Sequence, residues 1–233
     1  MSKSSREDPT RAAAALAHEL RQPLFALRGR LQLLHGGEGP VNDEVWSELQ
    51  VQLDHIESLL DHYGQPRQDL PAAPFDVREP VGHVLRMLKS KADAAGVVMC
   101  VDAPHEPVWV EGEAIAVRQI VANLLQNAID AVSPARVREI VVRVMLTDHE
   151  VTITIEDSGV GVPDDLRPHL FEPFVTTKPP GEGTGLGLFI SQRRVAELGG
   201  QVTIEPGPTG GTRARVVLPR VTAPTARSSS SAG

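Results

Sequence analysis

Cysteine, aromatic side chains and long apolar runs are all scarce in this sequence. Its 233 residues include 3% aromatics and one cysteine, Cys100. A single cysteine excludes a disulfide framework within the chain, and its place in the apolar run VVMCV predicts a buried thiol. A membrane-spanning helix requires a run of about 18 apolar residues, and the sequence contains no such run. The polar start MSKSSREDPT is unlike a signal peptide. We therefore expect a cytoplasmic protein with no membrane contact.

Positive charge is also in deficit. The formal net charge of −7 argues against a general nucleic-acid binder, which normally carries a basic face. The hydrophobic share of 41% and the charged share of 23% are ordinary for a globular protein. The length allows one or two domains, each with a core of its own.

Two leucine-rich helical patterns open the chain. Asp8 and Pro9 are suited to the N-cap and first position of a helix, and Gly36 predicts its end near His35. Leucines spaced by three and four residues form one narrow stripe along this helix, and a second apolar series runs from Trp46 to Tyr63. Two helices alone bury little, so we expect residues 9–64 to dimerise as a hairpin into a four-helix bundle. Residues 1–8 are expected to be disordered.

The remainder of the chain mixes helix and strand patterns. A proline-rich break at 65–74 predicts a linker, and the tail 221–233 is compositionally disordered. Between them, residues 75–220 predict helices and strands with mostly antiparallel pairing, that is, an α+β domain built as a two-layer sandwich. The predicted helices are 77–95, 113–132 and 187–200, and the predicted strands are 97–103, 107–112, 138–148, 150–158, 201–206 and 212–219.

Two glycine-rich stretches, DSGVGVPDDL and GEGTGLGL, predict a wall around an anionic ligand. Glycine lets backbone N–H groups approach an anion closely, and GTGLGL runs directly into a helix whose N-terminus favours phosphate. Asn123 and Asn127 lie four residues apart on the preceding helix and so share a face. Each of these features is weak evidence when taken alone.

Together, these segments resemble the sensor histidine protein kinases, whose ATP-binding domain shares a superfamily with gyrase, the mismatch-repair ATPases and the large heat-shock chaperone. LAHELRQPL resembles the H box, NLLQNAIDA the N box, DSGVG the first glycine box, FEPFVTTK the phenylalanine box and GEGTGLGL the second glycine box. GGT before the last strand resembles a closing glycine motif. The resemblance spans roughly residues 9–219, in the family's order.

The resemblance implies ATP and Mg²⁺ as cofactors. Asp157 would accept a hydrogen bond from the adenine amino group, and Asn127 would ligate Mg²⁺. Lys178 would neutralise phosphate charge. Phe171 and Phe174 would anchor a mobile lid over ATP. The alternative interpretation is that both side chains simply pack in the core. The remaining expected nucleotide contacts are Asn123, Asp130, Gly159, Gly161, Thr177, Gly183, Thr184, Gly185, Leu186, Gly187 and Thr212.

His18 stands in the H box, opposite the leucine stripe of its helix, and so is expected to face solvent. The resemblance makes it the phospho-acceptor. A histidine is largely unprotonated near neutral pH, so one ring nitrogen can attack the γ-phosphorus of ATP while Glu19 acts as general base. The phosphoryl group would pass to an aspartate on the receiver domain of a response regulator. Gln22 would orient a water that hydrolyses that phospho-aspartate.

Three other functions stay open at this point. ATP-hydrolysing chaperones and DNA-remodelling machines carry a glutamate one turn before the Mg²⁺ asparagine, where this chain has Asn123. A serine kinase of the anti-sigma-factor type shares the pocket, although the helical hairpin argues against it. A non-enzymatic scaffold that regulates a phosphorelay would have a degenerate pocket. Because only about eight residues precede the first helix, we expect regulation through a separate sensor protein, by a direct effect on the bundle, or not at all.

Overall fold

The computed structural model describes residues 72–173, 175–178, 185–208 and 210–223, together with Leu20, Leu24, Phe25, Arg28 and Ile56. The chain divides into two compact units, residues 1–69 and 70–233, and nearly all described residues belong to the second. The predicted hairpin, its dimerisation and most of both chain ends lie outside the described residues and stay predictions. Within the described part, no helix is both long enough and apolar enough to cross a membrane.

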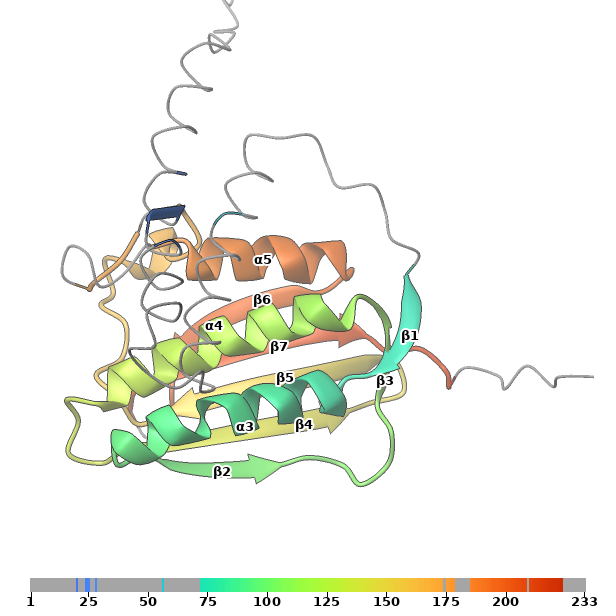
Figure 1. Ribbon diagram of the computed structural model, residues 1–233, viewed down its shortest axis with the longest axis horizontal. Coiled ribbons are helices and arrows are strands. Elements are labelled where there is room, and N and C mark those ends of the chain that lie inside the picture. Colours follow the sequence, from blue (N-terminus) through green and yellow to red (C-terminus); the bar gives the residue numbers. More distant parts are fainter. Residues whose placement is uncertain are drawn as a thin grey trace, which may run out of the picture. The chain divides into compact units, whose positions relative to one another are not determined.

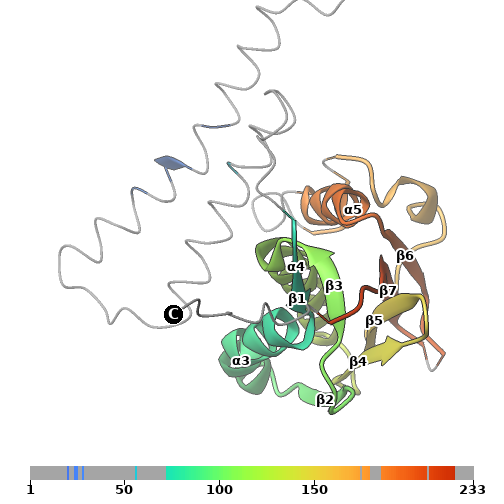
Figure 2. The same cartoon turned by 90° about the vertical axis from the view of Figure 1, so that its right-hand side faces the viewer.

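The second unit has two layers, with its helices on one face of a sheet (Figures 1 and 2). The strands are β1 (Ala73–Asp76), β2 (Val98–Asp102), β3 (Trp109–Gly112), β4 (Glu139–Leu146), β5 (Glu150–Asp157), β6 (Gln201–Pro206) and β7 (Thr212–Pro219). The helices are α3 (Arg78–Ala94), α4 (Ala114–Val132) and α5 (Gly187–Glu197), with a short 3₁₀ helix η1 (Arg167–His169). This arrangement confirms the predicted α+β class.

The main sheet has the order β2-β4-β5-β7-β6, and β1 pairs with β3 in a separate two-stranded sheet. β2 runs parallel to β4, and every other pair is antiparallel. Side chains alternate between the two faces of a strand. In β5, Val151, Ile153 and Ile155 are therefore buried on the helix side, each at most 2% exposed. Neighbouring strands continue this apolar face.

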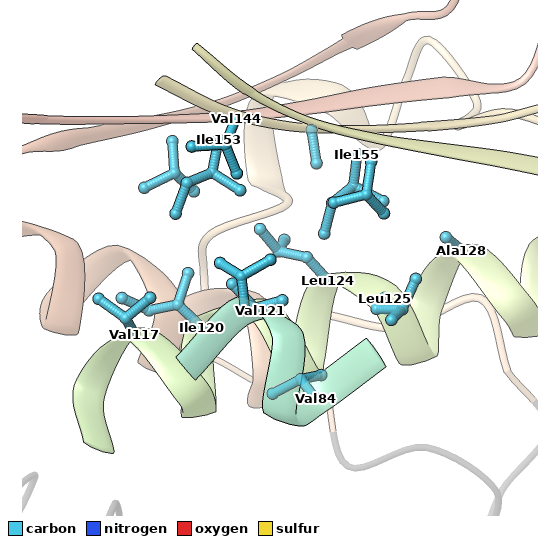
Figure 3. Packing of buried hydrophobic residues seen from close by; sticks show 14 of the residues in the cluster. Val84, Val117, Ile120, Val121, Leu124, Leu125, Ala128, Val144, Ile153 and Ile155 are labelled. Atoms are coloured by element: carbon cyan, nitrogen blue, oxygen red, sulfur yellow. The ribbon is translucent and has the colours of Figure 1, made fainter. Parts of the chain in front are cut away.

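Helix α4 packs at the centre of that face. Its buried side chains recur at spacings of three and four residues, which gathers them into one stripe: Val117, Ile120, Val121, Leu124, Leu125 and Ala128. They point toward Val144, Ile153 and Ile155 of the sheet (Figure 3). Because this packing sets the rotation of α4, it also sets where the polar stripe of the helix lies. Asn123, Asn127 and Asp130 fall within about 60° of one another on that stripe.

Two local expectations were wrong. Cys100 is exposed rather than buried, because β2 is an edge strand of the sheet. Cys100 pairs in register with Val141, whereas its neighbour Met99 pairs with the buried Ile140, so Cys100 faces away from the helices. Strand β1 was also missed, since it begins at Ala73 inside the predicted linker. Its pairing partner β3 lies more than thirty residues later, so no local sequence pattern predicts strand β1.

Candidate nucleotide-binding site

Asp157, the last residue of β5, is the one buried carboxylate among the described residues, with 8% of its surface exposed. Its Oδ1 atom accepts hydrogen bonds from the backbone N–H groups of Gly159 at 2.8 Å and Thr212 at 3.2 Å. Burial raises the pKa of Asp157, and these hydrogen bonds oppose the rise without cancelling it. Since a carboxylate accepts more than two hydrogen bonds, this fixed group has capacity for a ligand's amino donor.

The first glycine box and the closing glycine motif meet around Asp157. A Cβ atom on Gly159 would lie 2.6 Å from the carbonyl oxygen of Ala131, at the end of α4, and one on Gly211 would lie 2.0 Å from the carbonyl oxygen of Asp157. Gly161 has a φ of +75°, in the left-handed region that favours glycine. The close approaches require glycine at 159 and 211, and they hold the loop after β5 against both α4 and β7.

A hollow of about 400 Å³ opens beside this loop, a volume in the range of small-molecule sites. It is lined by Val160, Gly161, Val162, Pro163, Asp164 and Thr177. Val160 is 74% exposed, so its apolar side chain is open to a ligand in this hollow. The hollow therefore combines apolar and polar side chains on the loop that begins three residues after Asp157.

Asn123 ties α4 to the first turn of α5. Its Nδ2 atom donates to the carbonyl oxygen of Gly187 at 3.3 Å and to the hydroxyl of Ser191 at 3.5 Å. Ser191 is fully buried, and its hydroxyl donates to the same Gly187 carbonyl at 2.9 Å. Gly185 and Leu186 lead into this turn, with Leu186 only 3% exposed. The N-terminus of α5 is thus held in place by the N box.

Asp130 lies between two lysines from other parts of the chain. Its Oδ2 atom accepts from Lys178 at 2.5 Å, and its Oδ1 atom accepts from Lys91 at 3.0 Å. Burial raises the pKa of Asp130, but the hydrogen bonds and charges of the two lysines outweigh burial and lower it. Asn127, one turn earlier on α4, is half-buried. Lys178 therefore lies beside the polar stripe of α4.

The structure describes one of the two phenylalanines that were expected to anchor a lid. Phe171 is half-buried and packs against the apolar core, which agrees with the core-packing interpretation. Phe174, Gly183 and Thr184 lie outside the described residues. Among those that are described, no group of three or more His, Cys, Asp and Glu side chains is arranged to hold a metal ion.

Comparison with known families adds a second line of evidence. Residues 10–63 match the His Kinase A phospho-acceptor domain, and residues 112–222 match the histidine kinase-, DNA gyrase B- and HSP90-like ATPase. Together the two matches cover well over half of the chain. The chain belongs to the sensor histidine kinase family.

Individual histidine kinases are similar over most of the chain. The C4-dicarboxylate transport sensor protein DctB of Pseudomonas aeruginosa is 33% identical over 88% of this chain and 35% of its own length. The sensory histidine kinase/phosphatase NtrB of Rhizobium meliloti is 33% identical over 77% of this chain and 51% of its own length. Among solved structures, full-length ShkA in complex with AMPPNP matches with a TM-score of 0.65 and 25% identity, over 92% of this chain and 46% of that chain. The chain spans about a third of the length of the first curated relatives it matches.

The fold brings several predicted site residues of this chain into direct contact. Asp157 accepts hydrogen bonds from Gly159 and Thr212. Asn123 donates a hydrogen bond to Gly187, and Asp130 accepts one from Lys178. The H box residues His18, Glu19 and Gln22 lie outside the described residues.

Sequence reasoning missed two participants, Lys91 and Ser191. No motif marks either one. The spacing of Ser191 four residues after Gly187, at the start of a helix, was the one available signal.

Proposed function

We propose that this chain is a two-component sensor histidine kinase that autophosphorylates His18 from ATP and transfers the phosphoryl group to an aspartate of a response regulator. The observation that carries the proposal is the presence of both halves of such an enzyme on one chain. The phospho-acceptor match at 10–63 contains His18, and the ATPase match at 112–222 contains every proposed nucleotide contact.

The nucleotide would lie against the first glycine box. Asp157 would accept a hydrogen bond from the adenine amino group, and Val160 would offer the base an apolar surface. Gly161 and Thr177 line the same hollow, and Thr212 would keep the Asp157 carboxylate in place through its N–H group. The support for adenine at this end is that a buried carboxylate with a raised pKa suits a neutral amino donor better than it suits phosphate.

The phosphates would lie toward the second glycine box. Backbone N–H groups in the first turn of a helix have no acceptor inside that helix and favour an anion, so the second glycine box, with Gly183, Thr184, Gly185, Leu186 and Gly187, would lie along the phosphates. Lys178 would add positive charge.

Asn127 would give Mg²⁺ one amide oxygen. Mg²⁺ in nucleotide sites takes few protein ligands and fills its octahedron with phosphate oxygens and water, so one half-buried asparagine fits this role. Bound Mg²⁺ neutralises phosphate charge.

In the transfer step, a ring nitrogen of His18 would form a bond to the γ-phosphorus while the bond from that phosphorus to the bridging oxygen breaks and ADP leaves. Glu19 would accept or orient the proton on the other ring nitrogen. Phosphoryl transfer depends mainly on positioning of the reactants and neutralisation of charge. The N-terminal half would position His18, and the ATPase half would hold ATP and neutralise its phosphates.

The expected partners follow from this chemistry. The hairpin at 9–64 would form a homodimer, and His18 would give its phosphoryl group to a receiver domain. We also propose that Gln22 orients a water that hydrolyses the receiver's phospho-aspartate. NtrB, whose name states both kinase and phosphatase, supports this second activity as a precedent within the family.

The test is incubation of the purified chain with γ-labelled ATP and Mg²⁺, beside His18→Gln and Asn127→Ala. His83→Gln is the matched control for loss of a histidine, since His83 is an exposed histidine on α3. We expect label that acid removes and base does not, present in the wild type and in His83→Gln and absent from the other two variants. A purified receiver domain should then take the label.

Label on a serine of an added protein would contradict the proposal and favour the anti-sigma-factor type of kinase. ATP binding without label, in the presence of candidate activators, would favour a scaffold. Labelling that persists in His18→Gln would place the acceptor elsewhere.

A further inference from the structure

Asp130 is shared between two lysines that reach it from separate elements. Lys91 comes from the last turn of α3 and Lys178 is the last residue of the phenylalanine box, 39 and 48 residues away from Asp130 in sequence. Each lysine uses a different oxygen of the carboxylate, at 3.0 Å and 2.5 Å. The side chain of Asp130 is 30% exposed, so water screens these pairs only in part.

The lysine pairing makes Asp130 a competitor for Lys178. Both lysines favour the charged form of Asp130, and the pKa of this carboxyl is lowered accordingly. The carboxylate is therefore ionised near neutral pH, and it holds the amino group that the phosphates of ATP would need. Binding of a triphosphate requires Lys178 to exchange one anion for another.

Lys91 changes the free energy of that exchange. With Lys91 in place, departure of Lys178 leaves Asp130 in an ion pair. Without Lys91, the same departure would leave a partly buried carboxylate with no cation on either oxygen, close to the incoming phosphates. Like charges at short range repel, and an unpaired charge is costly where water reaches it only in part.

We propose that Lys91 is a positioning residue for nucleotide binding, which neutralises Asp130 so that Lys178 can leave that carboxylate for the phosphates of ATP. This inference rests on the proposed function, because it assumes that ATP binds beside α4. Lys91 acts here through Asp130, and it makes no contact with the nucleotide.

The test measures the dissociation constant of Mg²⁺·ATP by calorimetry on the full chain, for the wild type and for Lys91→Met. Methionine keeps the unbranched stem and removes the charge. The matched control is Lys89→Met on the same helix, since Lys89 pairs with Asp93 at 3.0 Å on an exposed surface. We expect Lys91→Met to weaken binding about two- to fivefold, the range for a partly exposed ion pair, and Lys89→Met to leave binding unchanged.

Asp130→Asn supplies the decisive comparison, because it removes the competitor and leaves Lys91 with nothing to neutralise. Lys91→Met should therefore have no effect on ATP affinity when it is combined with Asp130→Asn. Thermal unfolding followed by circular dichroism checks that all variants are folded.

An equal loss in both backgrounds would mean that Lys91 acts on the phosphates directly and would overturn the inference. So would a Lys91→Met affinity equal to that of Lys89→Met. Either result leaves the proposed function standing, whereas a wild-type chain that binds no ATP would overturn the proposed function and this inference with it.

Discussion

Gly211 is the position where a single methyl group should do most damage to the candidate site. Its φ is +70°, and a Cβ atom there would lie 2.0 Å from the carbonyl oxygen of Asp157 and 2.7 Å from the backbone nitrogen of Gly159. The neighbouring Gly210 provides the matched control. Its φ is +94°, but a Cβ atom there would have nothing within 4 Å.

The two alanine variants therefore differ in one physical effect. Left-handed backbone costs an L-residue about 1–2 kcal/mol, and both variants carry that cost. Gly211→Ala adds a contact with backbone atoms that cannot turn aside, for which overpacking costs of about 1–3 kcal/mol are typical. We expect Gly210→Ala to lower the free energy of unfolding by about 1–2 kcal/mol and Gly211→Ala by about 2–5 kcal/mol.

Urea unfolding followed by the fluorescence of Trp109 measures this difference. A Trp46→Phe background removes the other tryptophan, so the signal reports the second unit alone. Gly211→Ala should also weaken ATP binding about tenfold or more, equivalent to at least about 1.4 kcal/mol, because relief of the contact moves the carbonyl of Asp157 and the N–H group of Thr212. Equal urea midpoints for the two variants, or unchanged ATP affinity in Gly211→Ala, would refute the reasoning.

Two further expectations concern an ion pair and a buried hydroxyl. The Arg143 and Arg213 guanidinium groups, at 2.7 Å and 2.6 Å, lower the pKa of Glu156 against the opposing effect of burial. The pKa of Glu156 is lower in the folded than in the unfolded chain, so its pairing with the two arginines stabilises the fold. This contribution is complete above about pH 4.5 and disappears as the pH falls through the folded pKa of Glu156. Glu156→Gln should lower the free energy of unfolding by about 1 kcal/mol at pH 7 and by much less at pH 3, and a difference that persists in acid would argue against the ion pair. Ser191→Ala should cost about 1 kcal/mol of stability and weaken ATP binding, because Asn123 loses one of its two partners on α5. Ser133→Ala is the control, because it removes a comparable hydrogen bond from a hydroxyl to the carbonyl of Ile129 at 2.8 Å. It should leave ATP affinity unchanged. An equal loss of ATP affinity in Ser133→Ala would contradict the view that the contact of Asn123 with α5 supports nucleotide binding.

The types and spacings of the site residues could be predicted from the sequence alone. Asn123 and Asn127 share a face because 3.6 residues complete a helical turn. The alternation of Val151, Ile153 and Ile155 predicts a strand with one buried face, and Asp157 follows as the residue where that strand gives way to glycines. These features depend on neighbours in the sequence, so local stereochemistry is enough to infer them.

The tertiary structure alone decided which distant residues meet. Thr212 donates to Asp157 across 55 residues, and Asn123 reaches Ser191 across 68. The sharing of Asp130 by Lys91 and Lys178, and the exposed edge position of Cys100, likewise depend on the order of strands and the rotation of α4 in the packed core. Loop lengths and spacing patterns leave that order open, because the burial of apolar side chains over the whole unit selects it. The sequence therefore determined the chemical groups of the site, and packing determined their partners.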